Sequence, residues 1–288
     1  MFSVIVPVYN HARFVAQAIH SALRSPLVGE VLLVDDRSQD GSASVAARLA
    51  ATSSGRVRDL TVKGDSNRGA HYRLNQLVAA ATCEWIAVLN SDDVFVNGRF
   101  EALAFDPGFG KADFAFGHLL FINQLGELIG AKRGPDDPGV PFPECFQVSQ
   151  MVDGGNLLDL LAHQNYLGST SNMVFRKSLH SRIGGFAAYR YIHDWDFALR
   201  AMILGEPLYV RRFLTAYRMH PGNTISESQR GVDAEAAAAF TRLLSDFPEL
   251  TKRPEFARAL QPNANGVSIL SISPELSNTG GAVGISVP

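Results

Sequence analysis

The stretch Trp85–Asp93 reads WIAVLNSDD and joins an apolar run to two adjacent carboxylates. The apolar run is short and nearly continuous, which is typical of a strand buried on both faces. Ligands of open parallel sheets bind beyond the carboxyl ends of the strands. Asp92 and Asp93 therefore stand where a divalent cation and a phosphate are expected. This stretch alone leaves open the alternative that Ser91, Asp92 and Asp93 cap the next helix.

The eighty residues before this stretch alternate between strand and helix patterns. Further apolar strands are predicted at Ser3–Asn10, Glu30–Asp36 and Val57–Val62. Helical spacing follows at 14–23, at 40–51 and around 74–78. This order predicts a parallel sheet covered by helices, with right-handed crossovers. Polar residues at the strand ends should then converge on one edge of the sheet: Tyr9, Asp35, Asp36, Asn67, Arg68, Asp92 and Asp93.

The second half of the chain has a more mixed pattern. Short strands are expected at 112–116, 119–122, 208–210 and 213–217, and a turn at 123–126 leads into 127–129. Helices are expected around 157–161, from His193, and at 232–247. Residues 168–175 predict a small-residue loop that enters a strand. From residue 262 the composition turns to Ser, Gly, Asn and Pro, which favours a flexible tail.

The composition excludes several classes of protein. A formal net charge of -2 gives no basic excess for a nucleic-acid partner. Two distant thiols, Cys83 and Cys145, form neither a metal cluster nor a disulfide framework and fit a reducing cytosol. The chain starts directly with a strand pattern, and no uncharged apolar run approaches the ~18 residues of a membrane span. We therefore expect a cytoplasmic protein, with peripheral attachment to a membrane left open.

The sequence contains neither of two common glycine-rich motifs that bind phosphate. No G-x-G-x-x-G follows the first strand, and no G-x-x-x-x-G-K-[ST] occurs in the chain. Phosphates must therefore be held by a metal ion and side chains.

Six stretches in order resemble the family 2 glycosyltransferases of the GT-A fold. They are Val4–Asn10, Val34–Gly41, Asn67–Gly69, Leu89–Asp93, His193–Arg200 and Tyr217–His220. The resemblance covers about residues 2–225 and implies an α/β fold, a Rossmann-like and mostly parallel sheet flanked by helices, with a smaller mixed region on the acceptor side. The predicted units are a 1–225 domain, with a nucleotide-sugar-binding half (1–105) and an acceptor and catalytic half (106–225), a helical extension (226–261) and the tail (262–288).

The resemblance also implies an activity. It is the inverting, metal-dependent transfer of a single sugar from a nucleoside-diphosphate sugar, with UDP favoured, to an acceptor hydroxyl. The enzyme would be of the hexosyltransferase type and would use Mn²⁺ or Mg²⁺. Its acceptor would be a glycan or a lipid-linked glycan in polysaccharide biosynthesis, at the inner face of the membrane if attached there. The Q-x-x-R-W motif of the family's processive synthases is absent, which favours transfer of single sugars.

Individual roles follow from matching motif positions. Tyr9 and Asp36 match residues that hold the nucleobase by stacking and by hydrogen bonding, with Pro7 in the same turn and Arg68 in a loop that completes the base pocket. Asp92 and Asp93 match the acids that bind the metal and the ribose. Asp194 matches the general base, although it could also be a helix N-cap. His220 matches a late residue that approaches the metal or the pyrophosphate.

Two positions depart from the family pattern. Asn90 stands where many members have an acid, and His193 stands where an acid commonly precedes the base. These departures keep a second interpretation open, a catalytically inactive protein of the same fold that binds nucleotide sugars or acts as a scaffold. A nucleotidyltransferase is disfavoured because no glycine-rich loop follows the first strand. Asp196 and Arg200, four residues apart, are interpreted as a pair that only stabilises its own helix.

Overall fold

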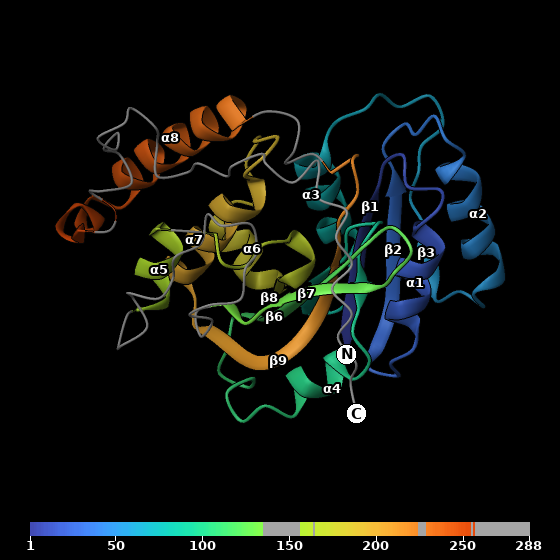
Figure 1. Cartoon of the computed structure of the whole chain (residues 1–288), viewed down its shortest axis with the longest axis horizontal. Coiled ribbons are helices and arrows are strands. Elements are labelled where there is room, and N and C mark those ends of the chain that lie inside the picture. The colour runs from blue at the N-terminus through green and yellow to red at the C-terminus, as the bar shows by residue number, and fades with distance from the viewer. Residues whose placement is uncertain (135–155, 164, 224–228, 255, 257–288) are drawn as a thin grey trace.

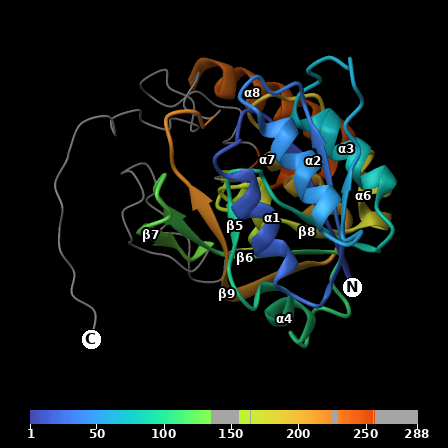
Figure 2. The same cartoon turned by 90° about the vertical axis from the view of Figure 1, so that its right-hand side faces the viewer.

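The computed structural model of the chain describes residues 1–134, 156–163, 165–223, 229–254 and 256. Its centre is one nine-stranded sheet with helices on both faces (Figures 1 and 2). The strands are β1 (Phe2–Val8), β2 (Val28–Asp35), β3 (Val57–Asp59), β4 (Trp85–Val88), β5 (Val94–Phe95), β6 (Phe114–Ile122), β7 (Leu128–Lys132), β8 (Val174–Arg176) and β9 (Pro207–Arg218). The helices are α1 (Val15–Leu23), α2 (Ser42–Thr52), α3 (Ala70–Ala80), α4 (Arg99–Ala104), α5 (Leu157–His163), α6 (Lys177–Ile183), α7 (His193–Leu204) and α8 (Gln229–Asp246). No described helix has the length and apolar character that a membrane span needs.

The first half of the sheet is parallel, as predicted. Strands β3, β2, β1 and β4 lie side by side in that order, and each pair among them is parallel. The sheet then continues with β8, β6, β9 and β5, where β4 and β6 are both antiparallel to β8, and β7 pairs with β6 outside this path. The expected mixed region is therefore part of the same sheet, and β4 is the strand at which the parallel part ends.

Strand β1 is buried on both faces because its side chains alternate between two apolar cores. Ile5 contributes to the core that includes α3, α5, α6, α7 and α8. Val4 and Val6 contribute to the core on the opposite face, which includes α1 and α4. This explains why the parallel strands appear in the sequence as continuous apolar runs without alternating polar residues.

Two pairs of predicted short strands are single strands in the structure. Residues 112–116 and 119–122 are joined in β6, and residues 208–210 and 213–217 are joined in β9. Gly117 and the exposed Arg211 and Arg212, which separate the patterns, lie at an irregularity in the β6–β9 register. Such a bulge lets a strand continue past residues that break its alternation. A Cβ on Gly117 would lie 2.6 Å from the Leu214 side chain, so the close approach there requires glycine.

Helix α6 was not predicted from the sequence. It has seven residues, of which only Leu179 and Ile183 are buried and apolar, so its periodic signal is short. Gly184 ends the helix in the left-handed conformation, with φ 81°.

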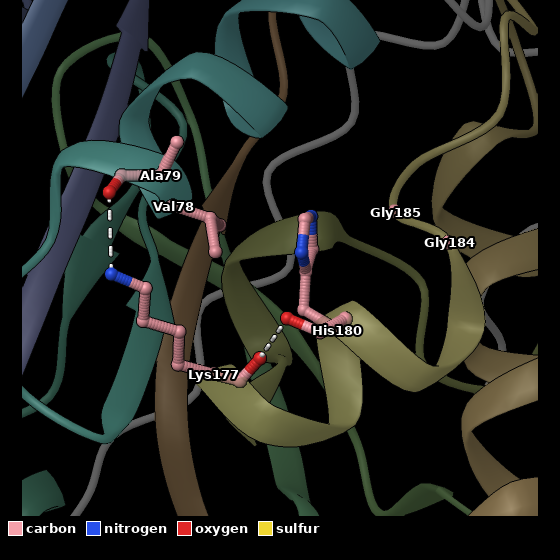
Figure 3. A pocket seen from close by; sticks show the side chains of 7 residues that line it. Val78, Ala79, Lys177, His180, Gly184 and Gly185 are labelled. Atoms are coloured by element: carbon pink, nitrogen blue, oxygen red, sulfur yellow. Dashed lines mark hydrogen bonds between the residues drawn. The ribbon is translucent and has the colours of Figure 1, made fainter.

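A pocket of about 280 Å³ lies between α3 and α6 (Figure 3). It is lined by Val78, Ala79, Lys177, His180, Ser181, Gly184 and Gly185, none of which is a predicted site residue. The Lys177 ammonium donates to the carbonyl oxygens of Ala79 and Ala81, at 3.2 and 2.7 Å. Its charge therefore satisfies carbonyl groups at the C-terminus of α3, which is a structural role.

Candidate functional site

The turn after β4 holds the two carboxylates, and it does not cap a helix. Strand β5 follows at Val94, and α4 starts later, with Gly98 as its N-cap. The alternative that Ser91, Asp92 and Asp93 cap the next helix is therefore wrong. Both carboxyl side chains are buried, so their partners determine what they can do.

Asp92 faces two imidazoles from opposite ends of the chain. The Oδ2 atom of Asp92 lies 2.9 Å from Nε2 of His220 and 3.7 Å from Nε2 of His11. One ligand atom from each of the three residues lies within 4.8 Å of the others. Two imidazole nitrogens and one carboxylate oxygen form a donor set that suits a first-row divalent transition metal. The predicted metal residues Asp92 and His220 thus come together, and His11 joins them.

The surroundings of this cluster shift the pKa values of His11 and Asp92. Burial lowers the pKa of the His11 imidazole, which favours its neutral form. The other ring nitrogen of His11 lies 2.8 Å from the Ser91 hydroxyl, which orients the ring. Burial opposes ionisation of Asp92, but the hydrogen bond from His220 and the neighbouring charge of His11 hold its pKa below the ordinary value.

Asp93 is engaged by protein donors. Its Oδ2 atom accepts from the hydroxyls of Ser169 and Ser171, at 2.9 and 2.6 Å, and its Oδ1 atom accepts from the Arg218 backbone N–H, at 2.9 Å. Burial and the adjacent charge of Asp92 raise the pKa of Asp93 to about 7. Asp93 is not in the three-residue cluster. Its contacts tie the turn 89–93 to the small-residue loop 169–171 and to β9. Metal binding by Asp93 stays a prediction.

Arg218 connects the turn to two other segments. Its Nε atom donates to the Asp92 carbonyl oxygen at 2.7 Å, and Nη2 donates to Oε1 of Gln17 on α1 at 2.7 Å. Its Nη1 atom donates to the Asn123 carbonyl oxygen, at the start of the β6–β7 turn, at 3.0 Å. The residue Arg218 is 1% exposed, so its guanidinium forms these hydrogen bonds in the protein interior.

Asp36, directly after β2, binds the loop between β3 and α3. Its Oδ1 atom accepts from Arg73 Nε at 2.7 Å and from the Arg68 backbone N–H at 2.9 Å, and its Oδ2 atom accepts from the Gly69 backbone N–H at 2.8 Å. The Asn67 side chain donates to the Asp36 carbonyl oxygen at 2.9 Å. The prediction that these strand-end residues converge is confirmed. Arg73, which is fully buried, was not predicted.

Aromatic and cationic side chains lie near the same loops. Tyr9, directly after β1, is 48% exposed. The Arg68 guanidinium lies over the Tyr72 ring, 3.9 Å from its centroid, while its backbone N–H bonds to Asp36. Pro7 is half-buried within β1, next to Val34 of β2. The assignment of Pro7, Tyr9, Asp36 and Arg68 to a nucleobase stays a prediction.

Asp194 is the second residue of α7, so it is not the N-cap, which is Ile192. Burial raises the pKa of Asp194, although the neighbouring His193, the Trp195 backbone N–H and the Asn165 side chain oppose the shift. A carboxylate with a raised pKa is a better proton acceptor.

Tyr217, near the end of β9, is affected electrostatically by three carboxylates. Burial raises the pKa of its phenol, and the charges of Asp93, Asp92 and Asp194 all act in the same direction. Asp92, Asp93 and Asp194 thus all act on the phenol of one side chain.

The buried pair of Asp196 and Arg200 does more than the sequence interpretation allowed. Arg200 donates to Asp196 and also to the carbonyl oxygens of Ile183 and Gly185, at 2.8 and 3.0 Å. It therefore holds the C-terminal end of α6 against α7. The interpretation of a pair that only stabilises its own helix is wrong.

Sequence reasoning missed His11 as a cluster member and assigned no role to Tyr217. His11 lies three residues after the end of β1, so the argument that strand ends converge could have included it. Tyr217 belongs to a motif that was recognised, but a tyrosine in a strand gives no signal of its electrostatic neighbours. The electrostatic neighbours of Tyr217 become visible only when β4 and β9 are placed together.

Comparisons with known proteins identify the family and the fold of this chain. The sequence profile described as "Glycosyl transferase family 2" matches residues 3–195. The chain is 28% identical over 260 residues to "Succinoglycan biosynthesis protein ExoU" of Rhizobium meliloti (strain 1021), covering 88% of this chain and 73% of that protein. It is 25% identical over 218 residues to "PGL/p-HBAD biosynthesis glycosyltransferase" of Mycobacterium tuberculosis (strain ATCC 25177 / H37Ra), covering 74% of this chain and 73% of that protein.

Solved structures share the fold at low sequence identity. Residues 1–349 of S. aureus TarS, in complex with UDP-GlcNAc, superpose with a TM-score of 0.61 and 15% identity, covering 84% of this chain and 66% of that one. Mannosyltransferase PcManGT from Pyrobaculum calidifontis, in complex with GDP-Man and Mn²⁺, has a TM-score of 0.61 and 18% identity, covering 89% and 68%. This chain therefore spans about two thirds of the length of each of these structures.

Proposed function

Because this chain belongs to glycosyl transferase family 2 and is thus a glycosyltransferase, we propose that it transfers a single sugar from a nucleoside-diphosphate sugar to an acceptor hydroxyl, with inversion and with a divalent cation. The observation that carries the proposal is the cluster of His11, Asp92 and His220, together with the carboxyl of Asp194, whose charge acts on Tyr217 as that of Asp92 does. One group suits the diphosphate and the other suits the proton of the acceptor.

The donor nucleoside binds at the ends of β1 and β2 in this proposal. The exposed ring of Tyr9 stacks on the base, and Asp36, which is already fixed by Arg73 and two backbone N–H groups, accepts a base N–H. Pro7 and Arg68 line the same pocket. The complexes of TarS with UDP-GlcNAc and PcManGT with GDP-Man support a nucleotide-sugar donor, and we favour a UDP-sugar.

The cation is held by Asp92, His220 and His11. Two imidazoles favour Mn²⁺ over Mg²⁺, because Mg²⁺ prefers oxygen ligands and retains its water. When bound, the cation supplies a Lewis acid that neutralises the charge of the departing diphosphate. Asp93 fixes the turn 89–93 through its hydrogen bonds with Ser169 and Ser171. Asp92 is the acid of this turn that binds the ribose in this proposal.

Asp194 acts as the general base. The acceptor oxygen attacks the anomeric carbon from the face opposite the diphosphate, so the new carbon–oxygen bond forms as the sugar–phosphate bond breaks and the configuration inverts. The hydroxyl proton passes to the Asp194 carboxylate, and the electron pair of the broken bond leaves with the diphosphate. General-base catalysis of this kind contributes about 10²–10⁴ in rate.

The acceptor is a glycan or a lipid-linked glycan, bound by the 106–225 half of the 1–225 domain. The names of the succinoglycan and PGL/p-HBAD relatives support a role in glycan biosynthesis. A lipid-linked acceptor would bring the protein to the inner face of a membrane as a peripheral enzyme. The 226–261 extension and the 262–288 tail complete the proposed organisation, and 262–288 lies outside the described residues.

The first test is thermal unfolding with UDP, GDP, dTDP and CDP, each with and without Mn²⁺. A ligand at 100 times its dissociation constant stabilises by about 2.7 kcal/mol, so one nucleotide should raise the melting temperature only when Mn²⁺ is present. Asp92→Asn should lose this shift, while Asp246→Asn, an exposed acid of α8, should keep it. No shift with any nucleotide would contradict the proposed donor site.

A second measurement separates the enzyme from the inactive binding protein. UDP or GDP release is followed with Mn²⁺ and a panel of UDP-glucose, UDP-galactose, UDP-N-acetylglucosamine and GDP-mannose, with water as the acceptor. Slow release that depends on Mn²⁺ and on Asp194 supports catalysis. A nucleotide-dependent thermal shift without any release would favour the inactive binding protein. Asn90, at a position where many family members have an acid, is the feature that suggests this alternative.

A further inference from the structure

Helix α8 lies outside the residues matched by the family profile, yet it packs directly on the helix that carries Asp194 (Figure 1). Phe240 of α8 meets Trp195 of α7 edge to face, with ring centroids 5.6 Å apart. Val232, Ala236 and Ala239 of α8 are buried in the same apolar core as α7. The start of α7 is therefore covered by a segment that is more than thirty residues away in sequence.

A single carboxylate of α8 engages the backbone just before Asp194. Oε1 of Glu235 accepts from the Arg190 N–H at 2.7 Å. Oε2 accepts from the Tyr191 N–H at 2.8 Å and from the Ile192 N–H at 3.3 Å. Three consecutive backbone donors thus converge on one side chain.

This contact lies directly before the first turn of α7. The N-cap residue of α7 is Ile192, which has no side-chain acceptor for the N–H groups of the first turn. Helix N-termini leave N–H groups without intrahelical partners, and a negative charge there is favourable for the helix dipole. Glu235 fixes the chain from Arg190 to Ile192 and so fixes the point at which α7 begins.

The fit between α8 and this loop is close. A Cβ placed on Gly231, one turn before Glu235, would lie 2.5 Å from a ring carbon of Tyr191. Glycine at 231 therefore lets the α8 backbone approach the Tyr191 ring, while Glu235 holds the backbone of the same residue. The loop is held both by packing and by charge-assisted hydrogen bonds.

We propose that Glu235 is a positioning residue that holds the general base Asp194 in place by binding the three backbone N–H groups of residues 190–192. The inference rests on the proposed function, since it gives Asp194 the role of base. Asp194 lies two residues after Ile192 on the first turn of α7, so a shift of the loop would move its carboxyl relative to Tyr217 and the metal cluster. A misplacement of about 1 Å can cost on the order of 10²-fold in rate.

The test uses the full chain with Glu235→Ala and Glu235→Gln, and with Asp246→Asn as a control on the same helix. Asp246 pairs with Arg242 at the surface, i to i+4 along α8. Each change is made in the wild-type and in the Asp194→Asn background, and release of nucleotide is measured with Mn²⁺ and the donor of the panel that turns over fastest.

If Glu235 positions the base, Glu235→Ala lowers kcat about 10- to 100-fold with KM for the donor and the UDP–Mn²⁺ thermal shift unchanged. Glu235→Gln gives a smaller loss, because its amide keeps one accepting oxygen, and Asp246→Asn behaves as wild type. In the Asp194→Asn background, Glu235→Ala causes no further loss, since the group that it positions is gone. Amide exchange at Arg190, Tyr191 and Ile192 becomes at least about tenfold faster in Glu235→Ala.

Distinct outcomes overturn the inference and the proposed function. If Asp194→Asn lowers release but Glu235→Ala does not, or if Glu235→Ala lowers it equally in both backgrounds, Glu235 does not act through the base. Unchanged amide exchange at residues 190–192 would also overturn the inference. If Asp194→Asn leaves release unchanged, the proposed function of Asp194 fails first and the role of Glu235 fails with it.

Discussion

The proposed site has two sides, a donor side around Asp36 and a base side around Asp194, and they are built in different ways. On the donor side, Asp36, Arg68 and Gly69 are joined by contacts between loops that follow neighbouring strands of the parallel sheet. On the base side, Asp194 depends on α7, on Asn165 and, through the preceding loop, on Glu235 of α8. The donor side is thus a property of the sheet edge, while the base side is a property of how late helices pack. The predictions below test this difference.

The largest expected effect is on the base side. Asp194→Asn should lower nucleotide release or sugar transfer by about 10²–10⁴, with UDP–Mn²⁺ binding retained. Its stability should not fall at pH 8, because a carboxyl whose pKa is raised by burial contributes stability only at low pH and loses it as pH rises through that pKa. Steady-state kinetics and chemical unfolding at pH 8 check both points. If Asp194→Asn also lost UDP binding, the donor side and the base side would not be independent of each other.

The next effect is on the stability of the donor side. Arg73→Met removes the buried partner of Asp36 and should cost about 3–5 kcal/mol in free energy of unfolding. The matched control is Arg242→Met, whose ion pair with Asp246 is about half exposed and should change stability by less than about 1 kcal/mol. Urea unfolding measures both variants. Equal effects of the two substitutions would show that the donor-side loops are not held by this buried pair.

Removal of one metal ligand should affect binding more than folding. Asp92→Asn should abolish the Mn²⁺-dependent part of the UDP stabilisation, up to about 2.7 kcal/mol at 100 times the dissociation constant. His11→Gln tests whether His11, which lies outside the family motifs, belongs to the cluster. This substitution should also reduce the Mn²⁺-dependent part of the UDP stabilisation. Titrations of UDP binding against Mn²⁺ decide this. Wild-type Mn²⁺ dependence in His11→Gln would reduce the cluster to Asp92 and His220.

Asp93 predicts a pH dependence of stability in the metal-free protein. Burial and Asp92 raise its pKa to about 7, so the folded state favours the protonated carboxyl. The stability that this gives is complete below about pH 4 and is lost as pH rises towards 7. Between pH 5 and pH 8 in EDTA, wild type should lose more stability than Asp93→Asn, by an amount on the order of 2 kcal/mol. Parallel pH profiles of the two proteins would contradict the shifted pKa.

The smallest expected effect concerns the exposed aromatic ring on the donor side. Tyr9→Ala should weaken UDP binding by roughly tenfold, since stacking of a base on an aromatic ring contributes about 1–3 kcal/mol. Tyr9→Phe should keep the ring and the affinity, and kcat at saturating donor should be unchanged in both. Calorimetric titration with UDP and Mn²⁺ measures the effect. A fall in kcat with unchanged affinity would move Tyr9 from the donor side to the reacting groups.

The donor side could largely be predicted from the sequence. Continuous apolar runs identify β1, β2 and β4, and the convergence of parallel strand ends brings Asp36, Asn67 and Arg68 together without any knowledge of side-chain contacts. His11, three residues after the end of β1, was accessible to the same argument. Fully buried Arg73 was not, because a lysine or arginine on an amphipathic helix normally faces water.

The base side could be predicted only where a motif was recognised. Asp194 was assigned by its place in a family motif, and its burial depends on packing that no local pattern encodes. The sequence shows α8 as an alanine-rich helix, but nothing in it indicates which of its acids faces the start of α7. The bulge that joins two predicted strands into β9 likewise depends on the partner strand β6.

The contacts of Arg218 have a consequence for exchanging parts between related proteins. A chimera that takes the nucleotide preference of one protein and the acceptor preference of another would be cut after α4 if the order of units along the chain were the guide. Such a graft would separate Asp92 from Arg218 and His220, which reach it from more than 120 residues later. The donor unit that can be inherited or transplanted intact is therefore discontinuous, and it consists of the first hundred residues together with the end of β9.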